Sequence, residues 1–345
     1  MKLKQLLFPH DAKAEHHKAL DGLRGWAVLL VLLGHGTNQG LSPWLEGTFF
    51  ARGKLGVYLF FVISAYLLDK QILQVWKQGR GSWSYWRYYI GRRFFRIFPP
   101  FLLALITFRL MNEAGFKVVM HTWDQVLHHL LLLRGDHIFW SIPTEFLYYL
   151  LSPVLLYLCL RLFKLRAVPT LLFFILLALG SIVLNALYDL PRFNTVRYLG
   201  VFAVGTLLAG FEVLFPVAWK AVVKGPWITV LAAAAMGIFL YWGWVAKDFT
   251  DASVYVPVAV LWGLLSLASF KVGWWQSFLS WTPFRWVGTV SYSLYLFHIP
   301  VLMWVKSLGL DATVAWGLFL FLSVVLASIL HLGIERPALS WVKRK

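Results

Sequence analysis

Two basic side chains share one face of the first long apolar stretch of the chain. Arg24 and His35 stand eleven residues apart, with only apolar residues and glycine between them. In an α-helix this spacing returns the second side chain to within about 20° of the first, about 16 Å further along the axis. One face of the helix therefore presents a permanent cation and, further along, a titratable imidazole that could serve a functional site. The alternative is a snorkelling arginine and a histidine that only bonds to a neighbouring helix.

Two further polar side chains are expected at a depth similar to that of His35. Glu145 follows shortly after Trp140 at the start of one apolar stretch, and His298 lies in another, after Ser291. A carboxylate beside an imidazole can fix its tautomer and raise its basicity, so Glu145 is a candidate to orient His35. Alternatively, Glu145 is a helix-start carboxylate favoured by the helix dipole, and His298 forms core hydrogen bonds only.

Three arginines precede a pair of prolines in the next basic segment. Arg92, Arg93 and Arg96 fall on one helical turn, so their guanidinium groups could converge on phosphates. The alternative is that they only follow the bias of basic residues toward the cytoplasmic side of a membrane. Glu335, near the end of the chain, either forms ion pairs with these arginines or is solvated.

Other catalytic signatures are missing from the sequence. It has no Gly-x-Ser-x-Gly elbow, no His-Glu-x-x-His zinc pair and no glycine-rich phosphate loop. His128 and His129 lack the spacing of metal ligands, and the one cysteine, Cys159, excludes an intrachain disulfide and a cysteine metal cluster. We therefore expect no metal.

Apolar helices must position these side chains. The chain has 345 residues, of which 60% are hydrophobic and 14% charged, whereas a soluble domain carries about 25% charged residues. Its apolar runs of about 18–24 residues are long enough to cross about 30 Å of hydrocarbon. We expect an all-α polytopic membrane protein, a single domain over 1–345 without a soluble domain. About ten transmembrane helices are expected, at 20–38, 55–74, 94–112, 140–161, 168–187, 196–215, 226–244, 254–270, 286–306 and 312–334.

The distribution of charge predicts the orientation of these helices. Between the expected helices, 22 Lys and Arg residues fall on the side of the two termini and 8 on the other side. Basic residues favour cytoplasmic loops, so both termini are expected in the cytoplasm. Because the net charge of +17 is concentrated in these short connections, nucleic-acid binding is not expected.

Taken in order, these residues resemble the acyltransferase 3 family of membrane acyltransferases. The arginine and histidine of the first helix are followed by five further blocks that span nearly the whole chain. They are Gly56–Leu67, Arg92–Pro100, Trp140–Pro153, Ser291–Pro300 and Glu335-Arg336-Pro337. Two positions depart from the family pattern. Tyr58 stands where an acidic residue is common, and Ala65 stands where glycine is common.

The resemblance implies a ten-helix protein of a bacterial cytoplasmic (inner) membrane. Such a protein takes an acyl group from cytoplasmic acyl-CoA, commonly acetyl-CoA, to a hydroxyl of a cell-envelope sugar or exported glycan. His35 is then the catalytic base, Arg24 its motif partner, and the cluster of Arg92, Arg93 and Arg96 is linked to donor binding. Some relatives carry a fused hydrolase-like domain with its own serine. This sequence shows none, so transfer is expected to finish at the membrane site or on a separate partner.

Four further side chains complete the expected site. Ser64 and Tyr66 are candidates to steady the oxyanion of the reacting carbonyl, and Trp140 and His298 are candidates for substrate contact. An acyl-histidine intermediate remains open. The expected partners are acyl-CoA, a glycan, the bilayer and proteins of envelope-glycan synthesis. The alternatives are a transporter or flippase that uses the buried Arg, His and Glu, and a membrane scaffold for polysaccharide synthesis.

Overall fold

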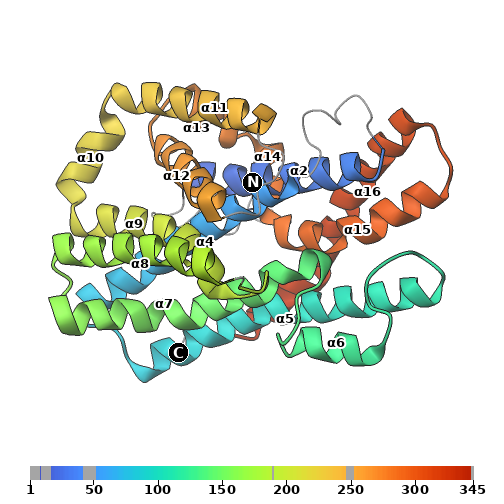
Figure 1. Ribbon diagram of the computed structural model, residues 1–345, viewed down its shortest axis with the longest axis horizontal. Coiled ribbons are helices and arrows are strands. Elements are labelled where there is room, and N and C mark those ends of the chain that lie inside the picture. The colour runs from blue at the N-terminus through green and yellow to red at the C-terminus, as the bar shows by residue number, and fades with distance from the viewer. Residues whose placement is uncertain (1–7, 9–16, 42–51, 189, 246–251, 343–345) are drawn as a thin grey trace.

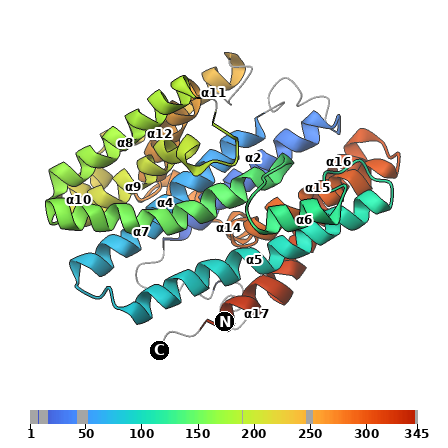
Figure 2. The ribbon, with the colours of Figure 1, turned by 60° about the horizontal axis from the view of Figure 1, so that its bottom comes forward.

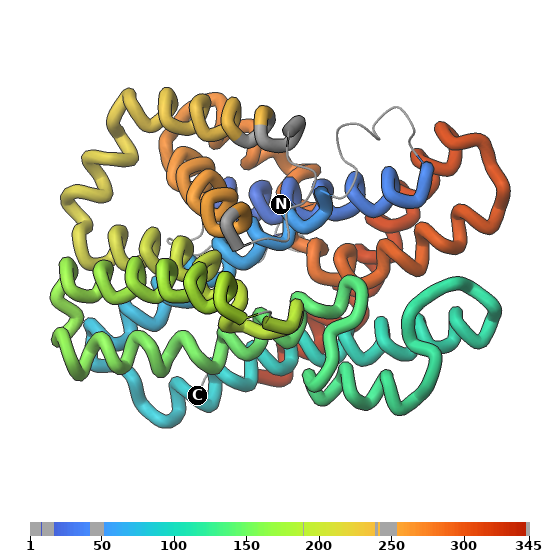
Figure 3. Tube along the Cα trace, in the orientation of Figure 1, coloured from blue at the N-terminus to red at the C-terminus, as the bar shows by residue number. Residues whose placement is uncertain are grey.

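The protein is all-helical over the residues that its computed structural model describes, which are 8, 17–41, 52–188, 190–245 and 252–342 (Figures 1 and 3). No strand occurs among them, so the expected all-α class is confirmed. The longer helices run roughly along the long axis of the molecule in Figure 1. This arrangement suits a bundle whose members cross a bilayer together.

The helices have the following bounds. They are α2 (Lys18–Asn38), α4 (Gly53–Lys77), α5 (Trp83–Glu113), α6 (Trp123–Leu130), α7 (Ser141–Phe163), α8 (Ala167–Leu187), α9 (Leu199–Leu214), α10 (Pro216–Lys224), α11 (Trp227–Val245), α12 (Ala252–Ala268), α13 (Trp274–Leu279), α14 (Thr282–Thr289), α15 (Ser291–Ser307), α16 (Ala312–Leu330) and α17 (Arg336–Ser340). Short 3₁₀ turns precede α7 (His137–Trp140) and α9 (Thr195–Tyr198), and a π turn (His331–Glu335) joins α16 to α17.

Each expected helical range overlaps a helix, but fewer helices qualify as membrane spans. In the described part of the chain, six helices are long and apolar enough to cross a membrane, or up to eight if each bent pair counts as one span. The bent pairs are α10 with α11, at 73°, and α14 with α15, at 78°. The expected ninth helix is therefore broken near its start. The count of ten spans and the side of the termini stay predictions.

Small residues let α4 pack closely against α2 on one side and α9 on the other (Figure 2). A Cβ atom added to Gly56 of α4 would lie only 2.1 Å from the carbonyl oxygen of Ala27 on α2. A Cβ on Gly205 of α9 would lie 2.2 Å from the carbonyl oxygen of Val62. The backbones can approach this closely only because no side chain intervenes. The functional side chains of α2 and α4 therefore stand on tightly packed helices.

Outer helices present apolar side chains to the surroundings. On α8, Leu176 is 66% exposed, and on α16, Phe321 is 65% exposed. Exposed apolar side chains on long helices are what a lipid-facing surface requires. The polar site must therefore lie in the interior of the bundle.

Candidate active site

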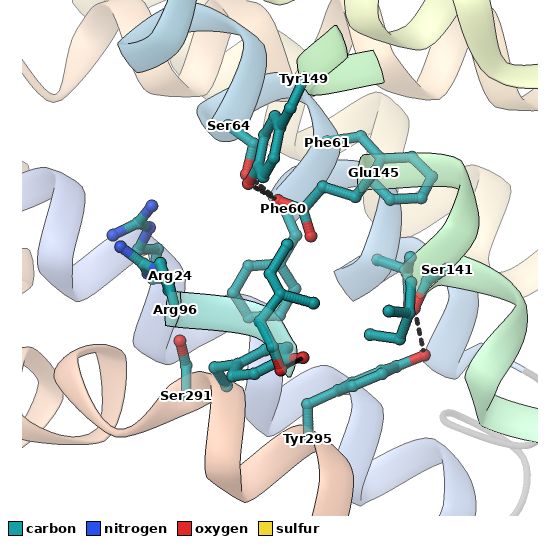
Figure 4. A pocket seen from close by; sticks show the side chains of 14 residues that line it. Arg24, Phe60, Phe61, Ser64, Arg96, Ser141, Glu145, Tyr149, Ser291 and Tyr295 are labelled. Atoms are coloured by element: carbon teal, nitrogen blue, oxygen red, sulfur yellow. Dashed lines mark hydrogen bonds between the residues drawn. The ribbon is translucent and has the colours of Figure 1, made fainter. Parts of the chain in front are cut away.

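A cavity opens between α2, α4, α5, α7 and α15, and we call it the inner cavity (Figure 4). One part of its wall is apolar and includes Val57, Phe60, Phe61 and Ile142. The polar part of the wall includes Arg24, Ser64, Arg96, Glu145, Tyr149 and Tyr295. Side chains from five helices thus meet around a space in which an apolar arm and a charged group could both be accommodated.

Two arginines enter the inner cavity side by side. Arg24 comes from α2 and Arg96 from α5, and their guanidinium groups lie together at one end of the space in Figure 4. Within the described residues, neither guanidinium forms a hydrogen bond or ion pair. Two like charges held together without direct partners attract an anion. This end of the inner cavity is therefore suited to a negatively charged group.

Glu145 is the carboxylate that lines the inner cavity, and it accepts hydrogen bonds from side chains of α4 and α7. It accepts a hydrogen bond of 2.6 Å from the Ser64 hydroxyl and another from the Tyr149 hydroxyl. The expectation that Glu145 orients His35 is therefore wrong, because its hydrogen bonds go to other partners. Glu145 is level with Ser64, eleven residues further along α4 than Gly53, which lies beside His35.

His35 is oriented by a second histidine instead. Nε2 of His298 lies 3.1 Å from Nδ1 of His35, and Nδ1 of His298 lies 2.6 Å from the carbonyl oxygen of Tyr295. Because that carbonyl can only accept, His298 carries its proton on Nδ1 and accepts at Nε2. His35 then donates from Nδ1, shared between His298 and the carbonyl oxygen of Val31 at 3.0 Å. The lone pair of His35 is left on Nε2, where a general base needs it.

His35 lies just beyond the inner cavity. A Cβ added to Gly53 would be 3.6 Å from Cε1 of His35, whereas Val57, one helical turn further along α4, lines the cavity. The four residues from Gly53 to Val57 correspond to about 6 Å along the helix axis. Tyr295 links the two, because it lines the cavity and its ring centroid is 6.0 Å from that of His298, the hydrogen-bond partner of His35. His35 is therefore a near neighbour of the inner cavity.

Tyr295 is held in place by two hydrogen bonds. Its hydroxyl donates to the carbonyl oxygen of Ile138 at 2.5 Å and accepts from the Ser141 hydroxyl at 2.9 Å (Figure 4). Both partners lie where the chain enters α7. Movement of Tyr295 would thus be coupled to this entry segment, where His137 places its ring 5.9 Å from that of His35.

A second and larger cavity lies at the start of α5, and we call it the arginine cavity. Its volume is about 1100 Å³, and its wall includes Arg80, Arg87, Arg92 and Arg93. Among the described residues, no aspartate or glutamate lines it. A wall with four cations and no carboxylate favours a ligand with several negative charges.

The expected convergence of three arginines is only partly correct. Arg92 and Arg93 line the arginine cavity, but Arg96 lines the inner cavity beside Arg24. Arg93 connects the two spaces, because its guanidinium lies 5.1 Å from the ring centroid of Tyr149, which lines the inner cavity. The two cavities therefore share a wall.

Two predicted substrate contacts lie away from both cavities. The Tyr66 hydroxyl donates to the Glu212 carboxylate at 2.5 Å, and Glu212 also pairs with Lys70 at 2.8 Å. Tyr66 and Lys70 of α4 thus hold Glu212 of α9. The Trp140 ring packs against the ring of Phe61, with 5.8 Å between the centroids, and Trp140 does not itself line the cavity. Their predicted contact with substrate therefore has no support in the geometry.

Glu335 does not pair with the arginine cluster. It accepts hydrogen bonds from the backbone N–H of Ser293, at 3.0 Å, and from the Ser293 hydroxyl, and it lies 3.0 Å from Nδ1 of His331. Its carboxylate thus stabilises the first turn of α15, where backbone N–H groups lack helical partners. The ion-pair expectation for this residue is wrong.

The two departures from the family pattern have structural counterparts. Tyr58 is 1% exposed and packs against Tyr255, with 5.7 Å between the ring centroids. A Cβ added to Gly205 would lie 2.8 Å from the Cβ of Ala65, so at this contact the glycine stands on the facing helix α9 and not at position 65.

Sequence reasoning missed one buried carboxylate, Asp69. It is fully buried and accepts hydrogen bonds from Tyr148 at 2.6 Å, Thr206 at 2.5 Å and Ser152. An acidic residue inside an apolar run was the signal that could have revealed it. Its partners come from α7 and α9, which identifies Asp69 as a polar junction of three helices.

Of the two neighbouring histidines on α6, His128 and His129, the second has a structural role. His129 is fully buried, lies 2.7 Å from the carbonyl oxygen of Gln125 through Nδ1, and accepts from the backbone N–H of Asp136 through Nε2 at 3.0 Å. Burial lowers the pKa of His129, in keeping with a neutral ring. Among the described residues, no group of three or more His, Cys, Asp or Glu side chains could hold a metal ion.

Comparison with known proteins finds acyltransferases. A family profile described as an acyltransferase domain matches residues 17–333. O-acetyltransferase OatA of Staphylococcus aureus is 26% identical over 92% of this chain and 56% of the relative. Putative peptidoglycan O-acetyltransferase YrhL of Bacillus subtilis is 25% identical over 94% and 56%, and peptidoglycan O-acetyltransferase OatA of Listeria monocytogenes is 26% identical over 82% and 49%. The chain spans about half the length of these relatives. No solved structure matches the chain.

Proposed function

Because this chain belongs to the acyltransferase family whose profile it matches, we propose that it moves an acetyl group from acetyl-CoA to a hydroxyl of a cell-envelope glycan. The names of the relatives support the acetyl group and the glycan, since all three are named O-acetyltransferases and two of the names include peptidoglycan. The apolar helices support a multi-pass membrane protein. Ten crossings of a bacterial inner membrane with both termini in the cytoplasm complete the proposal.

One observation carries the proposal: the arginine cavity and the inner cavity share a wall, and the inner cavity ends one turn from His35. CoA is a polyanion with a long and slender pantetheine arm. The arginine cavity offers four cations for its phosphates. The arm would cross the shared wall at Arg93 and Tyr149, whose guanidinium and ring would have to separate to admit it, and the thioester would enter the inner cavity. The excess of Lys and Arg on the side of the termini supports a cytoplasmic position for the arginine cavity.

The reaction follows from the protonation states of the site. The acceptor hydroxyl gives its proton to Nε2 of His35 while its oxygen attacks the thioester carbonyl. A carbon–oxygen bond forms, the carbon–sulfur bond breaks, and CoA leaves as a thiolate. Arg24 and Arg96 line the inner cavity, with Arg24 about 16 Å from His35 along α2, where they would attract a negatively charged part of the donor. General-base catalysis of this kind contributes typically 10²–10⁴-fold to the rate.

Reconstituted protein tests the proposal directly. Liposomes containing the purified chain are supplied with acetyl-CoA labelled in the acetyl group and with peptidoglycan-derived oligosaccharides. Mass spectrometry should detect an O-acetylated oligosaccharide, formed in proportion to the CoA released. Movement of the oligosaccharide across the bilayer without ester formation would instead identify a transporter and overturn the enzyme proposal.

A further inference from the structure

An exposed tryptophan stands at the rim of the arginine cavity. Trp341 follows α17, lines this cavity and is 75% exposed. Its ring meets that of Phe95 in an edge-to-face arrangement, with 6.0 Å between the centroids and 70° between the planes. The next residue, Val342, packs beside Gly91, where an added Cβ would lie 3.3 Å from the valine side chain. The turn after α17 is thus seated on α5, and the indole is presented to the cavity.

The other aromatic rings of this cavity are less available. Tyr85 is 9% exposed and Tyr89 is 3% exposed. Tyr88 is engaged with Arg92, whose Nη1 lies 3.1 Å from the tyrosine hydroxyl. Trp341 is therefore the lining ring with the largest free surface, although it stands in a wall of cations.

The polar end of CoA combines two kinds of group. Its phosphates suit the four arginines, but its adenine is a flat ring that is recognised best by stacking on an aromatic surface. We propose that Trp341 stacks on the adenine ring of the donor, so that the turn after α17 forms the nucleotide-binding part of the arginine cavity. This inference rests on the proposed function, because it takes acyl-CoA as the donor.

A tryptophan near a membrane surface also has a second role, which is anchoring at the interface. The chain contains a matched control for that role. Trp83, at the start of α5, is exposed to the same extent, 75%, but it does not line the arginine cavity. The two roles therefore predict different behaviour for variants at these two positions.

Two acetyl donors separate nucleotide recognition from every other effect. Acetyl-CoA carries the adenosine, whereas acetyl-4′-phosphopantetheine lacks it. The variant Trp341→Ala should raise KM for acetyl-CoA by on the order of tenfold, because the stacking surface is lost. Its KM for acetyl-4′-phosphopantetheine should equal that of the wild type, and kcat with either donor should be retained. The conservative variant Trp341→Phe should restore most of the affinity, and Trp83→Ala should change neither KM.

The remaining outcomes contradict the inference in recognisable ways. An equal rise of KM for both donors, or the same rise in Trp83→Ala, would assign Trp341 to anchoring or folding. Should Trp341→Ala fail to fold, the inhibition constant of adenosine 3′,5′-bisphosphate is measured instead for the wild type, Trp341→Phe and Trp341→Leu. Only the leucine variant should have a raised constant. Equal inhibition constants for all three proteins would overturn the inference. A wild type that uses neither donor would refute the proposed function itself.

Discussion

Nε2 of His298 lies 3.1 Å from Nδ1 of His35, and the His298 ring is itself fixed through its Nδ1, which lies 2.6 Å from the carbonyl oxygen of Tyr295. The hydrogen-bond acceptor behind the proposed base is therefore a neutral imidazole and not a carboxylate. Such an acceptor fixes the tautomer of His35 but adds no negative charge to stabilise the imidazolium that forms on proton transfer. The base is oriented strongly and its charged form is stabilised weakly.

Removal of the base should abolish most of the transfer. His35→Ala is expected to lower kcat for glycan acetylation by about 10²–10⁴-fold, the usual contribution of a general base. Acetyl-ester formation in liposomes gives the rate, and a detergent thermal-unfolding curve shows that the protein is still folded. His128→Ala, a change at a half-exposed histidine of α6, is the matched control and should be active. Normal product formation by His35→Ala would remove this residue from the chemistry.

Loss of the orienting histidine should have a smaller effect on the same step. His298→Ala leaves Nδ1 of His35 with only the carbonyl oxygen of Val31, so a fraction of the His35 rings adopts the unproductive tautomer. We expect kcat to fall on the order of tenfold, less than in the variant without the base, with KM for acetyl-CoA unchanged. His298→Gln, whose amide oxygen can accept from Nδ1–H, should recover part of the rate. If the alanine and glutamine variants had equal rates and pH profiles, the orienting role would be lost.

Helical spacing predicted which side chains share a face, but it could not predict their depth relative to other helices. Arg24 and His35 are placed on α2 by periodicity alone, and both were identified from the sequence. The depth of Glu145 depends on how α7 sits against α4, which is set by packing and hydrogen bonds between helices. Its pairing with Ser64 instead of His35 is therefore information that no spacing along α7 contains.

The arginine cavity shows the same limit. Arg92 and Arg93 belong to the helical turn that the sequence singled out, but Arg80 precedes α5 and is brought to them by the connection after α4. Trp341 arrives from the opposite end of the chain. Contacts between distant segments depend on the tertiary fold, and the spacing of residues along one sequence does not reveal them.

Neutralisation of the arginine cavity should weaken donor binding more than catalysis. In the double variant Arg92→Gln with Arg93→Gln, two positive charges of the proposed phosphate site are lost. Each charge-assisted hydrogen bond contributes about 1.5–3 kcal/mol, so KM for acetyl-CoA should rise by tenfold or more. Arg134→Gln is the control, because this exposed arginine pairs with Asp136 at 3.2 Å and lies outside the cavity. An unchanged KM at low ionic strength would argue against the cavity as the donor site.

Crowding the contact between α4 and α9 should destabilise the whole site. In Gly205→Ala the new methyl group would lie 2.2 Å from the carbonyl oxygen of Val62, a backbone atom that cannot rotate away. The two helices must separate, which we expect to cost about 1–3 kcal/mol and to lower the unfolding temperature in detergent. Gly317→Ala is the matched control on α16, since nothing lies within 4 Å of the added atom, and its unfolding temperature should be unchanged or higher.

Because α4 carries Ser64 and the turn beside His35, the Gly205 variant should also lose acetyl transfer in proportion to the separation of the helices. Equal unfolding temperatures for the two alanine variants would show that the α4–α9 contact is looser than the structure has it, and that the positions of Ser64 and His35 do not depend on it.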